Sequence, residues 1–441
     1  MKSRNAGKEY YLDAHKAFEK ARRNREESSW MQRLRADAIS SFAATGFPTI
    51  HDEDWKYFDV SPLAALDCAP VFDYKLNGLA SGGIDTLGTD KGSRLTFING
   101  QYSAELSTPQ ALPAGATVCS LAAALTAHAE VLQLHLGRYA TAAQSAFNAL
   151  NMAFLQDGAF IYIPDGIVIE EPINLCFASK SGDATTMTHP RNLIVAGKNS
   201  QVTIIESYVC ARDDVYFTNS VTEVVAGDGA SIDHYKVQME SEQAFHVGTM
   251  QVQTGRDCNF ASHSIALGGK MVRNNANAVL GAEGTTCTLN GLVLGHGEQI
   301  IDNHTIMDHA QPRCNSHELY ANILDGKARG VFNGKIFVRP DAQKTDAKQS
   351  NRNLLLSRDA IIDTKPQLEI FADDVKCTHG ATIGQLDEDA LFYLRARGID
   401  KDKARDILTY AFASEIIDQI KVEPLRDRLS NELLSRLARG R

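Results

Sequence analysis

A repeat with a period near 29 residues in the middle of the chain is the feature that most restricts the fold. Short apolar segments follow glycine-containing turns, and their landmark residues are Val202, Ile232, Phe260 and Leu289. The steps between these landmarks are 30, 28 and 29 residues. Repeats of about 20 to 50 residues are typical of solenoids, in which each coil buries its apolar face only against its neighbours. The repeat therefore favours a parallel β-helix, although a β-sandwich with evenly spaced hairpins has a similar rhythm.

Short apolar runs of the same kind continue on both sides of the repeat. They are rich in Val, Ile, Phe and Tyr, and Gly, Asp, Asn or Lys separates them. They lie at 160–164, 192–197, 202–205, 223–227, 249–253, 277–281, 291–295 and 335–338. Strands that are this short and this regularly punctuated indicate a mainly β structure. We predict that a β-helix core occupies residues 156–384.

Helical periodicity replaces this pattern at both ends of the chain. Apolar residues recur about once per turn over 15–42, and a second helical stretch covers 140–155. After Gly384 the apolar period returns to that of a helix. We therefore predict a mainly helical N-terminal region at 1–155 and a C-terminal helical domain at 385–441.

The composition excludes several classes of protein. The 441 residues carry a formal net charge of −9, so a nucleic-acid-binding surface over the whole molecule is not expected. The eight cysteines include no CxxC pair, which excludes a disulfide-stapled secreted domain and the common zinc fingers. The first 20 residues lack an apolar segment, and no apolar run approaches the ~18 residues of a membrane helix. We expect a protein of a reducing compartment, the cytoplasm, with no membrane contact.

Several enzyme signatures are absent from the sequence. No GxxxxGK[ST] motif occurs, so we expect the chain to bind no nucleotide through a P-loop. No GxSxG nucleophile elbow and no HExxH zinc motif occur either. The sequence therefore predicts a protein that is not an enzyme on its own.

The densest group of potential metal ligands lies between residues 302 and 317. His304, His309 and Cys314 are the candidates, and imidazole and thiolate donors suit zinc or iron. His304 and His309 are an odd number of residues apart, so on one strand they point to opposite faces. Pro312 also interrupts the segment before Cys314. An autonomous metalloprotein is an alternative, and buried histidines that satisfy backbone groups are the simpler interpretation.

Cys377 and His379 form a smaller and cleaner pair. They end the strand-like segment LEIFADDVKC, and residues two apart share one face of a strand. A thiolate beside an imidazole is a natural ligand set for iron or an iron–sulfur cluster. The same two groups also suit a nucleophile–base pair, but no orienting group stands at a fixed spacing. A buried cysteine that packs beside a turn histidine is the structural alternative.

Two polar stretches carry weaker signals. Residues 341–353 are interpreted as a long turn or an Asn/Gln ladder, without a catalytic role. Asp373 and Asp374 suggest a β-helix enzyme of the secreted type that acts on carbohydrates, since glycoside chemistry uses two carboxylates. Adjacent residues of a strand face opposite sides, however, and such enzymes are usually secreted, so this alternative is weak.

The C-terminal helices present apolar stripes that must be covered. Asp387 is a plausible N-cap for the first helix, which Gly398 ends. Two further stripes follow, formed by Ala404, Ile407, Leu408, Ala411 and Phe412 and then by Leu425, Leu429, Leu433 and Leu437. We expect the tail to dock on its own β body by default, or in the groove of a partner.

Long segments of the last third resemble the SufB/SufD family of iron–sulfur cluster assembly scaffolds. The resemblance is carried by DNHTIMDHA, ARGVFNGKIFV, DAQKTDAKQSNRNLLLS and DTKPQLEIFADDVKCTHGATIGQLDEDALFYLRARGI, and by the N-terminal GFPT and DEDWKYFDVSPL. It is close over 302–399 and looser elsewhere. At the strand end, Cys377-Thr378-His379-Gly380 is similar to the SufD branch, because the SufB branch has Glu-His-Glu-Ala-Thr there. Gly380 stands where that branch has its second glutamate.

The resemblance implies a fold and a set of partners. The family has a right-handed parallel β-helix between helical ends, and its members pair through their β-helices, here with a SufB-like paralogue. The C-terminal helices hold a SufC-like ABC ATPase, so that nucleotide hydrolysis is the partner's work. The resemblance leaves two questions open: whether the isolated chain forms a homodimer, and whether the complex contains a flavin.

The resemblance also implies a site. His379 and Cys377 become ligands for iron or for a transient iron–sulfur cluster that is shared with the partner at the interface. The residues expected to contact the ATPase are Asp387, Leu391, Phe392, Leu394 and Arg395.

Overall fold

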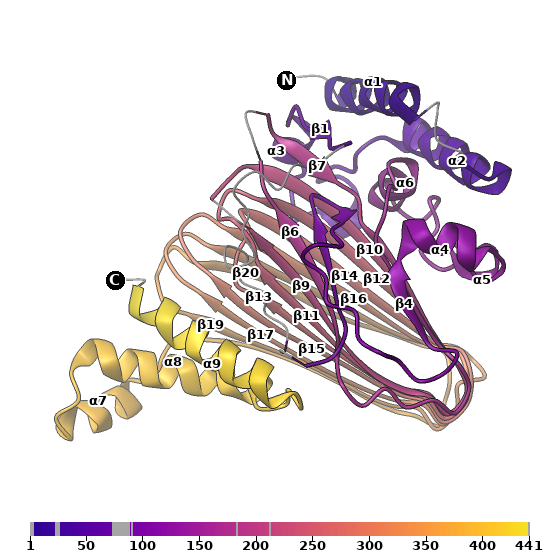
Figure 1. Ribbon diagram of the computed structural model, residues 1–441. Helices are drawn as coiled ribbons and strands as arrows, with labels where there is room; N and C mark the ends of the chain where they lie inside the picture. The colour runs from indigo at the N-terminus through magenta and orange to yellow at the C-terminus, as the bar shows by residue number, and fades with distance from the viewer. Residues whose placement is uncertain are drawn as a thin grey trace.

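The computed structural model describes residues 4–22, 27–72, 89, 91–181, 184–210 and 213–439. Within them the strands form two sheets, named sheet A, with eleven strands, and sheet B, with ten. From β8 to β21 the chain alternates between the sheets, so that each strand pairs in parallel with the second strand before or after it. A sandwich of hairpins would instead pair consecutive strands in antiparallel fashion. The predicted β-helix is confirmed as a β-solenoid of about seven turns (Figure 1).

The strands of the two sheets interleave along the sequence. Sheet A contains β1 (Ala69–Pro70), β4 (Thr117–Ser120), β5 (Ala159–Ile163), β7 (Thr186–Thr188), β8 (Arg191–Ala196), β10 (Tyr216–Ala226), β12 (Phe245–Thr254), β14 (Met271–Leu280), β16 (Ile300–His309), β18 (Arg329–Val338) and β20 (Ile361–Ile370). Sheet B contains β2 (Arg94–Ile98), β3 (Gln101–Tyr102), β6 (Ile173–Ser179), β9 (Gln201–Cys210), β11 (Ser231–Met239), β13 (Asn259–Ala266), β15 (Thr286–Gly295), β17 (Asn315–Leu324), β19 (Asp346–Leu355) and β21 (Lys376–Gly384). Apolar side chains of both sheets meet in one core inside the solenoid.

The glycine-containing turns of the repeat are the corners at which the chain passes from sheet A to sheet B. One residue in each corner has a positive φ, and Asn199, Gly229, Asp257 and Gly284 occupy this position in four successive coils. Gly, Asn and Asp tolerate this left-handed backbone better than other residues do. The corner thus explains why the repeat is punctuated by these residue types.

The ladder of sheet B corrects one of the four landmarks. Val202 pairs with Ile232, and Ile232 pairs with Phe260, as the repeat predicts. Phe260 then pairs with Cys287 rather than with Leu289. Leu289 points to the same face two residues later, and a pattern with a period of two does not distinguish these positions.

The N-terminal helices cover the outer face of sheet A. They are α1 (Arg4–Arg22), α2 (Ser29–Thr45), the 3-10 helix η1 (Glu53–Trp55), α3 (Ser61–Ala64), α4 (Leu121–Ala127), α5 (Ala129–His135) and α6 (Ala146–Ala153). Their apolar side chains share a core with Leu193, Phe217 and Val247 of sheet A. The region 1–155 also supplies strands to the solenoid, because β2 pairs in parallel with β6.

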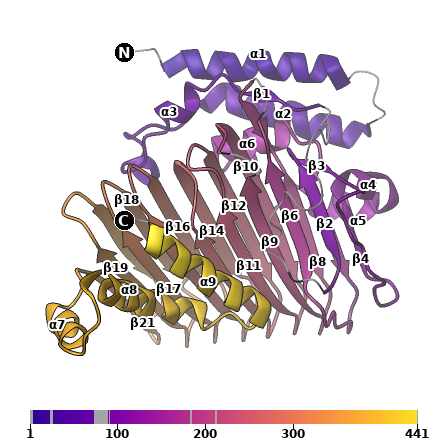
Figure 2. The ribbon, with the colours of Figure 1, turned by 60° about the vertical axis from the view of Figure 1, so that its left-hand side comes forward.

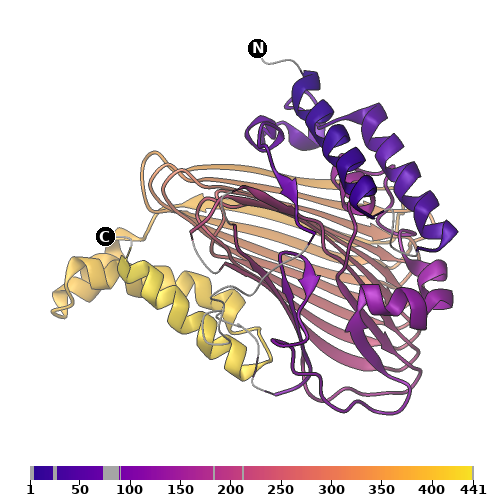
Figure 3. The same cartoon turned by 45° about the horizontal axis from the view of Figure 1, so that its top comes forward.

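Two of the three C-terminal helices dock on the outer face of sheet B. They are α8 (Lys401–Ile417) and α9 (Glu423–Arg439), whereas α7 (Glu388–Ala396) packs on α8 and extends away from the sheets (Figure 2). The N-terminal and C-terminal helices lie on opposite sides of the solenoid (Figure 3). No helix among the described residues is long and apolar enough to cross a bilayer.

The apolar stripe predicted for α8 is only partly correct. Ala404 is buried, but Ile407 is 39% exposed and Ala411 is exposed as well. The side chains that enter the core instead include Ala413, Ile416 and Ile417. The second half of α8 makes the contact with the sheet, so its first half keeps part of the stripe free.

Candidate functional site

The two sheets end together at the C-terminal end of the solenoid. β20 is the last strand of sheet A and β21 is the last strand of sheet B, and within the described residues each pairs on one side only. Large apolar side chains are exposed along this end, namely Ile361, Ile370, Phe371 and Ile383. Long, exposed apolar edge strands are templates for pairing with another chain. This end of the solenoid is therefore a candidate docking surface.

Cys377 and His379 lie on β21, at this open end. Cys377 pairs with Ala347 and His379 pairs with Gln349, so both side chains lie on the same face of the strand, as the spacing predicts. That face is the inner one, because Cys377 packs against the core of the solenoid. Cys377 is half-buried and His379 is exposed. The structure thus brings a thiol and an imidazole to the rim of the open end.

The thiol is not activated by its own chain. Burial raises the pKa of Cys377, and the nearby carboxylate of Asp346 raises it further. At neutral pH the side chain is therefore protonated, and a bound cation or a partner must favour the thiolate before it acts as a ligand. Within the described residues no group of three or more His, Cys, Asp or Glu side chains is placed to hold a metal ion.

A buried polar pair lies directly beneath His379, and the sequence patterns missed it. Gln349 of β19 donates a hydrogen bond from Nε2 to Oε2 of Glu318 on β17. Burial raises the pKa of Glu318 to about 7, although the hydrogen bond from Gln349 opposes the shift. Gln349 belongs to the strand β19 (Asp346–Leu355), so most of the stretch 341–353 is not the long turn that was one of its two interpretations. The pair is recognised only from the register of the strands, which pairs Glu318 with Gln349 and Gln349 with His379 on the inner face of sheet B.

His304, His309 and Cys314 do not converge. His304 lies on the outer face of β16, where its Nε2 is 3.1 Å from the Asp302 carboxylate. His309 is fully buried on the opposite face, 2.9 Å from Ser316 Oγ, as the odd spacing predicts. Cys314 is buried after the end of that strand, and its thiol points to backbone carbonyl oxygens. The arrangement gives no support to an autonomous metal site built on these three.

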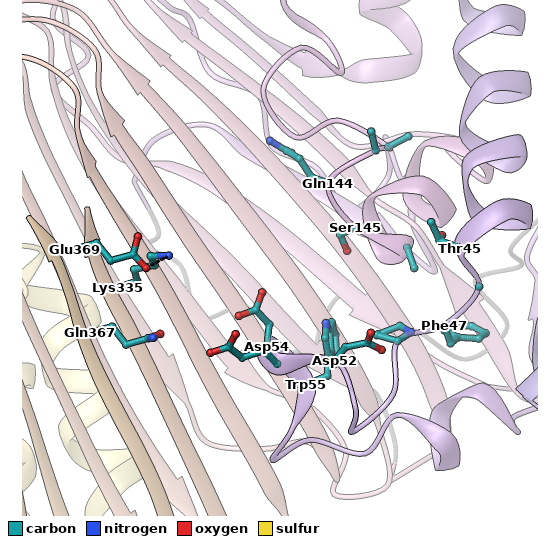
Figure 4. Close-up of a pocket in the computed structure, with 16 residues that line it drawn as sticks. Thr45, Phe47, Asp52, Asp54, Trp55, Gln144, Ser145, Lys335, Gln367 and Glu369 are labelled. Atoms are coloured by element: carbon teal, nitrogen blue, oxygen red, sulfur yellow. Dashed lines mark ion pairs between the residues drawn. The ribbon is translucent and has the colours of Figure 1, made fainter. Parts of the chain in front are cut away.

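A groove of about 550 Å³ lies between the N-terminal helices and sheet A (Figure 4). A neighbouring cavity of about 410 Å³ shares Trp55 and Lys335 with it and reaches His304. Phe147 stacks on Trp55, and the Arg273 guanidinium lies 3.8 Å from the ring centre of Trp55, so the indole already contacts two side chains of its own chain.

The two carboxylates that suggested a carbohydrate-active enzyme, Asp373 and Asp374, line neither of these cavities. Asp374 forms an ion pair with Lys344 at the corner before β21. Asp373 is exposed in the same loop, outside both cavities. The two acids are therefore surface residues of a turn.

The residues predicted to contact an ATPase lie on α7. Asp387 caps this helix, since its carboxylate accepts hydrogen bonds from the backbone N–H groups of Asp389 and Ala390. Leu391 is buried against α8 and Leu394 is partly buried. The next residue after Leu391, Phe392, is 74% exposed. Arg395 is exposed as well, so α7 presents an aromatic and a basic side chain to solvent.

Comparisons with known proteins agree on one family. Residues 177–412 match the model of the SUF system FeS cluster assembly SufBD core domain, and residues 5–175 match the SufBD protein N-terminal region. An iron–sulfur cluster assembly SufBD family protein of Synechocystis sp. is 36% identical over 91% of this chain and 90% of its own length. The iron–sulfur cluster assembly protein SufD of Escherichia coli is 31% identical over 91% and 92%. SufD of Bacillus subtilis is 27% identical over 92% and 93%.

Proposed function

The chain belongs to the SufBD family of iron–sulfur cluster assembly proteins, and we propose that it is the SufD-type scaffold subunit of a complex that builds a nascent cluster. The observation that carries this proposal is the position of Cys377 and His379 at the open end of the solenoid. There a thiol and an imidazole, which are suitable donors for iron, lie beside two sheet edges that carry no further strand among the described residues. The cluster is the cargo of this site, and the chain itself performs no turnover.

This chain offers fewer ligands than a cluster needs, and a partner that binds the docking surface at the open end would supply the others. An iron–sulfur cluster needs about four protein ligands, and this chain offers two. A second solenoid that extends both sheets from β20 and β21 would bring its own ligands to the open end, beside Cys377 and His379. The proposed partner is a SufB-like paralogue.

The second proposed contact is an ABC ATPase of the SufC type on α7. Phe392 and the neighbouring Tyr393 are both more than half exposed, on a helix that extends away from the sheets. Exposed aromatic side chains beside an arginine are typical of the residues that dominate protein interfaces. ATP hydrolysis in the complex is then assigned to the partner.

The cluster site is tested by anaerobic reconstitution of the purified complex. His379→Ala is expected to lose most of the cluster absorbance, because one of the few ligands is removed. His317→Ala is the matched control, since His317 is an exposed histidine on the outer face of the same sheet. Wild-type cluster loading in His379→Ala would overturn the assignment of the site.

The ATPase contact is tested with a point variant. Deletion of 387–441 is unsuitable, because α8 and α9 cover the apolar outer face of sheet B and their removal would expose it. Phe392→Asp is expected to abolish co-purification of the ATPase while the melting temperature stays unchanged. Leu434→Asp is the control, since Leu434 is 45% exposed on α9. Retained capture by Phe392→Asp would refute the placement on α7.

A further inference from the structure

Sheet B stacks a column of side chains inside the solenoid that ends at His379. Glu318 of β17 pairs with Gln349 of β19, and Gln349 pairs with His379 of β21. These three strands are neighbours in sheet B (Figure 2). Adjacent strands of a sheet are about 4.8 Å apart, so directly paired side chains on one face lie one above the other. Below Glu318 the column continues with Leu289, which ends the polar run. The polar run is therefore a chain of a carboxyl group, an amide and an imidazole.

The middle member of this run has a buried acceptor without a partner. Nε2 of Gln349 donates to Glu318, whereas Oε1 of Gln349 is buried and accepts no hydrogen bond from the described residues. The pKa of Glu318 is raised to about 7, so at pH 8 its carboxylate is mostly ionised and only accepts hydrogen bonds; it then holds the NH₂ end of the amide and leaves the oxygen for another donor. Buried polar atoms in proteins are usually satisfied, so an orphan acceptor requires an explanation.

The neighbouring inner amide has no such vacancy. Nδ2 of Asn351 donates to the backbone oxygen of Tyr320, and Oδ1 of Asn351 accepts from Asn353. Asn351 also pairs with Ala381, and not with a histidine. Both ends of that amide are therefore occupied, whereas Oε1 of Gln349, like Oε1 of Glu318, has no partner among the described residues, and of these two residues only Gln349 pairs with His379.

We propose that Gln349 is the positioning residue of His379: its Oε1 accepts the hydrogen bond of one imidazole nitrogen and directs the other nitrogen to the open end. Glu318 acts one step further back, because it sets which end of the Gln349 amide faces the histidine. A histidine that binds iron as a neutral ligand has one free ring N–H, and an acceptor for that N–H sets both the tautomer and the ring orientation. The inference rests on the proposed function for the role of His379 as a ligand, but the hydrogen bond itself does not.

The first test reads the tautomer of His379 in the full-length chain without iron. The protein is labelled with ¹⁵N-histidine and measured at pH 8, and the His379 signals are those missing from His379→Asn. In the wild-type chain one ring nitrogen is expected to be protonated and the other not. In Gln349→Leu the two nitrogen shifts are expected to move toward the averaged values of an unrestrained histidine. Unchanged shifts in this variant would overturn the proposal.

Two further variants separate positioning from folding. Asn351→Leu removes the adjacent inner amide and is expected to leave the His379 tautomer as it is. Glu318→Gln is nearly isosteric and keeps the site folded, but an amide partner no longer selects one end of Gln349, so the tautomer preference is expected to weaken. A change in Asn351→Leu as large as that in Gln349→Leu would also overturn the proposal, because it would point to a general loss of structure.

The second test concerns iron. In the purified complex, Gln349→Leu is expected to weaken ferrous iron binding by about 10- to 100-fold, the usual effect of losing an outer partner of a metal-bound histidine. If His379→Ala leaves iron binding intact, the proposed function fails while the tautomer result stands. If the tautomer is unaffected by Gln349→Leu, the positioning role fails whatever the iron affinity.

Discussion

Removal of the Arg191 guanidinium tests how the N-terminal region is held on the solenoid. Arg191 begins β8, and both it and Glu223 of β10 are fully buried. Its Nε and Nη2 donate to Glu223 Oε2 over 3.0 and 2.7 Å. Nη1 donates to Asn151 of α6 over 3.0 Å, and Nη2 donates to the Ala140 oxygen over 2.8 Å. The guanidinium thus links sheet A to α6 and to the segment before it.

The size of the effect follows from what the variant Arg191→Met leaves behind. Removing one member of a buried ion pair costs about 3–5 kcal/mol, because the other charge stays buried without compensation. Glu223 keeps three backbone donors, the N–H groups of Gly137, Tyr139 and Ala140, at 2.9 to 3.0 Å. These bonds moderate the penalty, so we expect a loss near the lower limit, about 3 kcal/mol.

Equilibrium unfolding in urea measures this loss, with a double-mutant cycle to isolate the pair. In Arg191→Met combined with Glu223→Gln no charge is left buried, so the double variant is expected to lose less than the sum of the single variants, with a coupling of about 0.5–3 kcal/mol. Arg352→Met removes the guanidinium of a partly exposed pair with Glu415 and is expected to cost less than about 1 kcal/mol. The reasoning is refuted if Arg191→Met costs no more than this control.

Three further predictions concern pH, thiol reactivity and packing. Burial raises the pKa of Glu318 from 4.5 to about 7, so the native chain holds a proton there that the unfolded chain releases. Its contribution to stability therefore rises as the pH falls from about 7 to 4.5, and urea unfolding of Glu318→Gln should lack this part of the pH dependence. Burial also raises the pKa of the Cys287 and Cys377 thiols, so mass spectrometry after iodoacetamide treatment at neutral pH should show Cys287 unmodified and Cys377 slow; rapid alkylation of Cys377 would contradict the environment described. Leu429→Ala should cost about 2–5 kcal/mol because Leu429 lies on α9 and is fully buried in the core between this helix and sheet B, whereas Phe392→Ala should stay within about 0.5 kcal/mol in the same thermal melts; equal effects would contradict the docking of α9.

Predictions that concern a single strand or a single helix agree with the structure. The spacing of Cys377 and His379 predicted that they share a face, and the odd spacing of His304 and His309 predicted that they do not. Asp387 was correctly predicted as a helix N-cap. These predictions depend only on the geometry of a single element, which a short segment determines by itself.

Predictions that needed the arrangement of several elements were less complete. The stripe of α8 was read from periodicity, but the contact with sheet B selects Ala413 and Ile416 and leaves Ile407 exposed. Helix periodicity shows that a face is apolar, and it does not show which part of the face meets a partner.

The repeat by itself favoured stacked coils, because each coil of a solenoid buries its apolar face against its neighbours, but only the parallel pairing of alternate strands excluded a sandwich of hairpins. The spacing of two residues placed Cys377 and His379 on one face of a strand, but the segment LEIFADDVKC is not one strand: it crosses the corner between β20 and β21, so the pair lies at the start of β21 and not at the end of a strand. The tertiary structure alone decided that Gln349 lies beneath His379 and Glu318 beneath Gln349. These residues are 30 and 31 positions apart in the chain, whereas Phe260 and Cys287 of the same sheet are 27 apart. The number of residues in each coil varies with its corners, so the column that faces the site is set by the ladder of hydrogen bonds between coils and not by any period in the sequence.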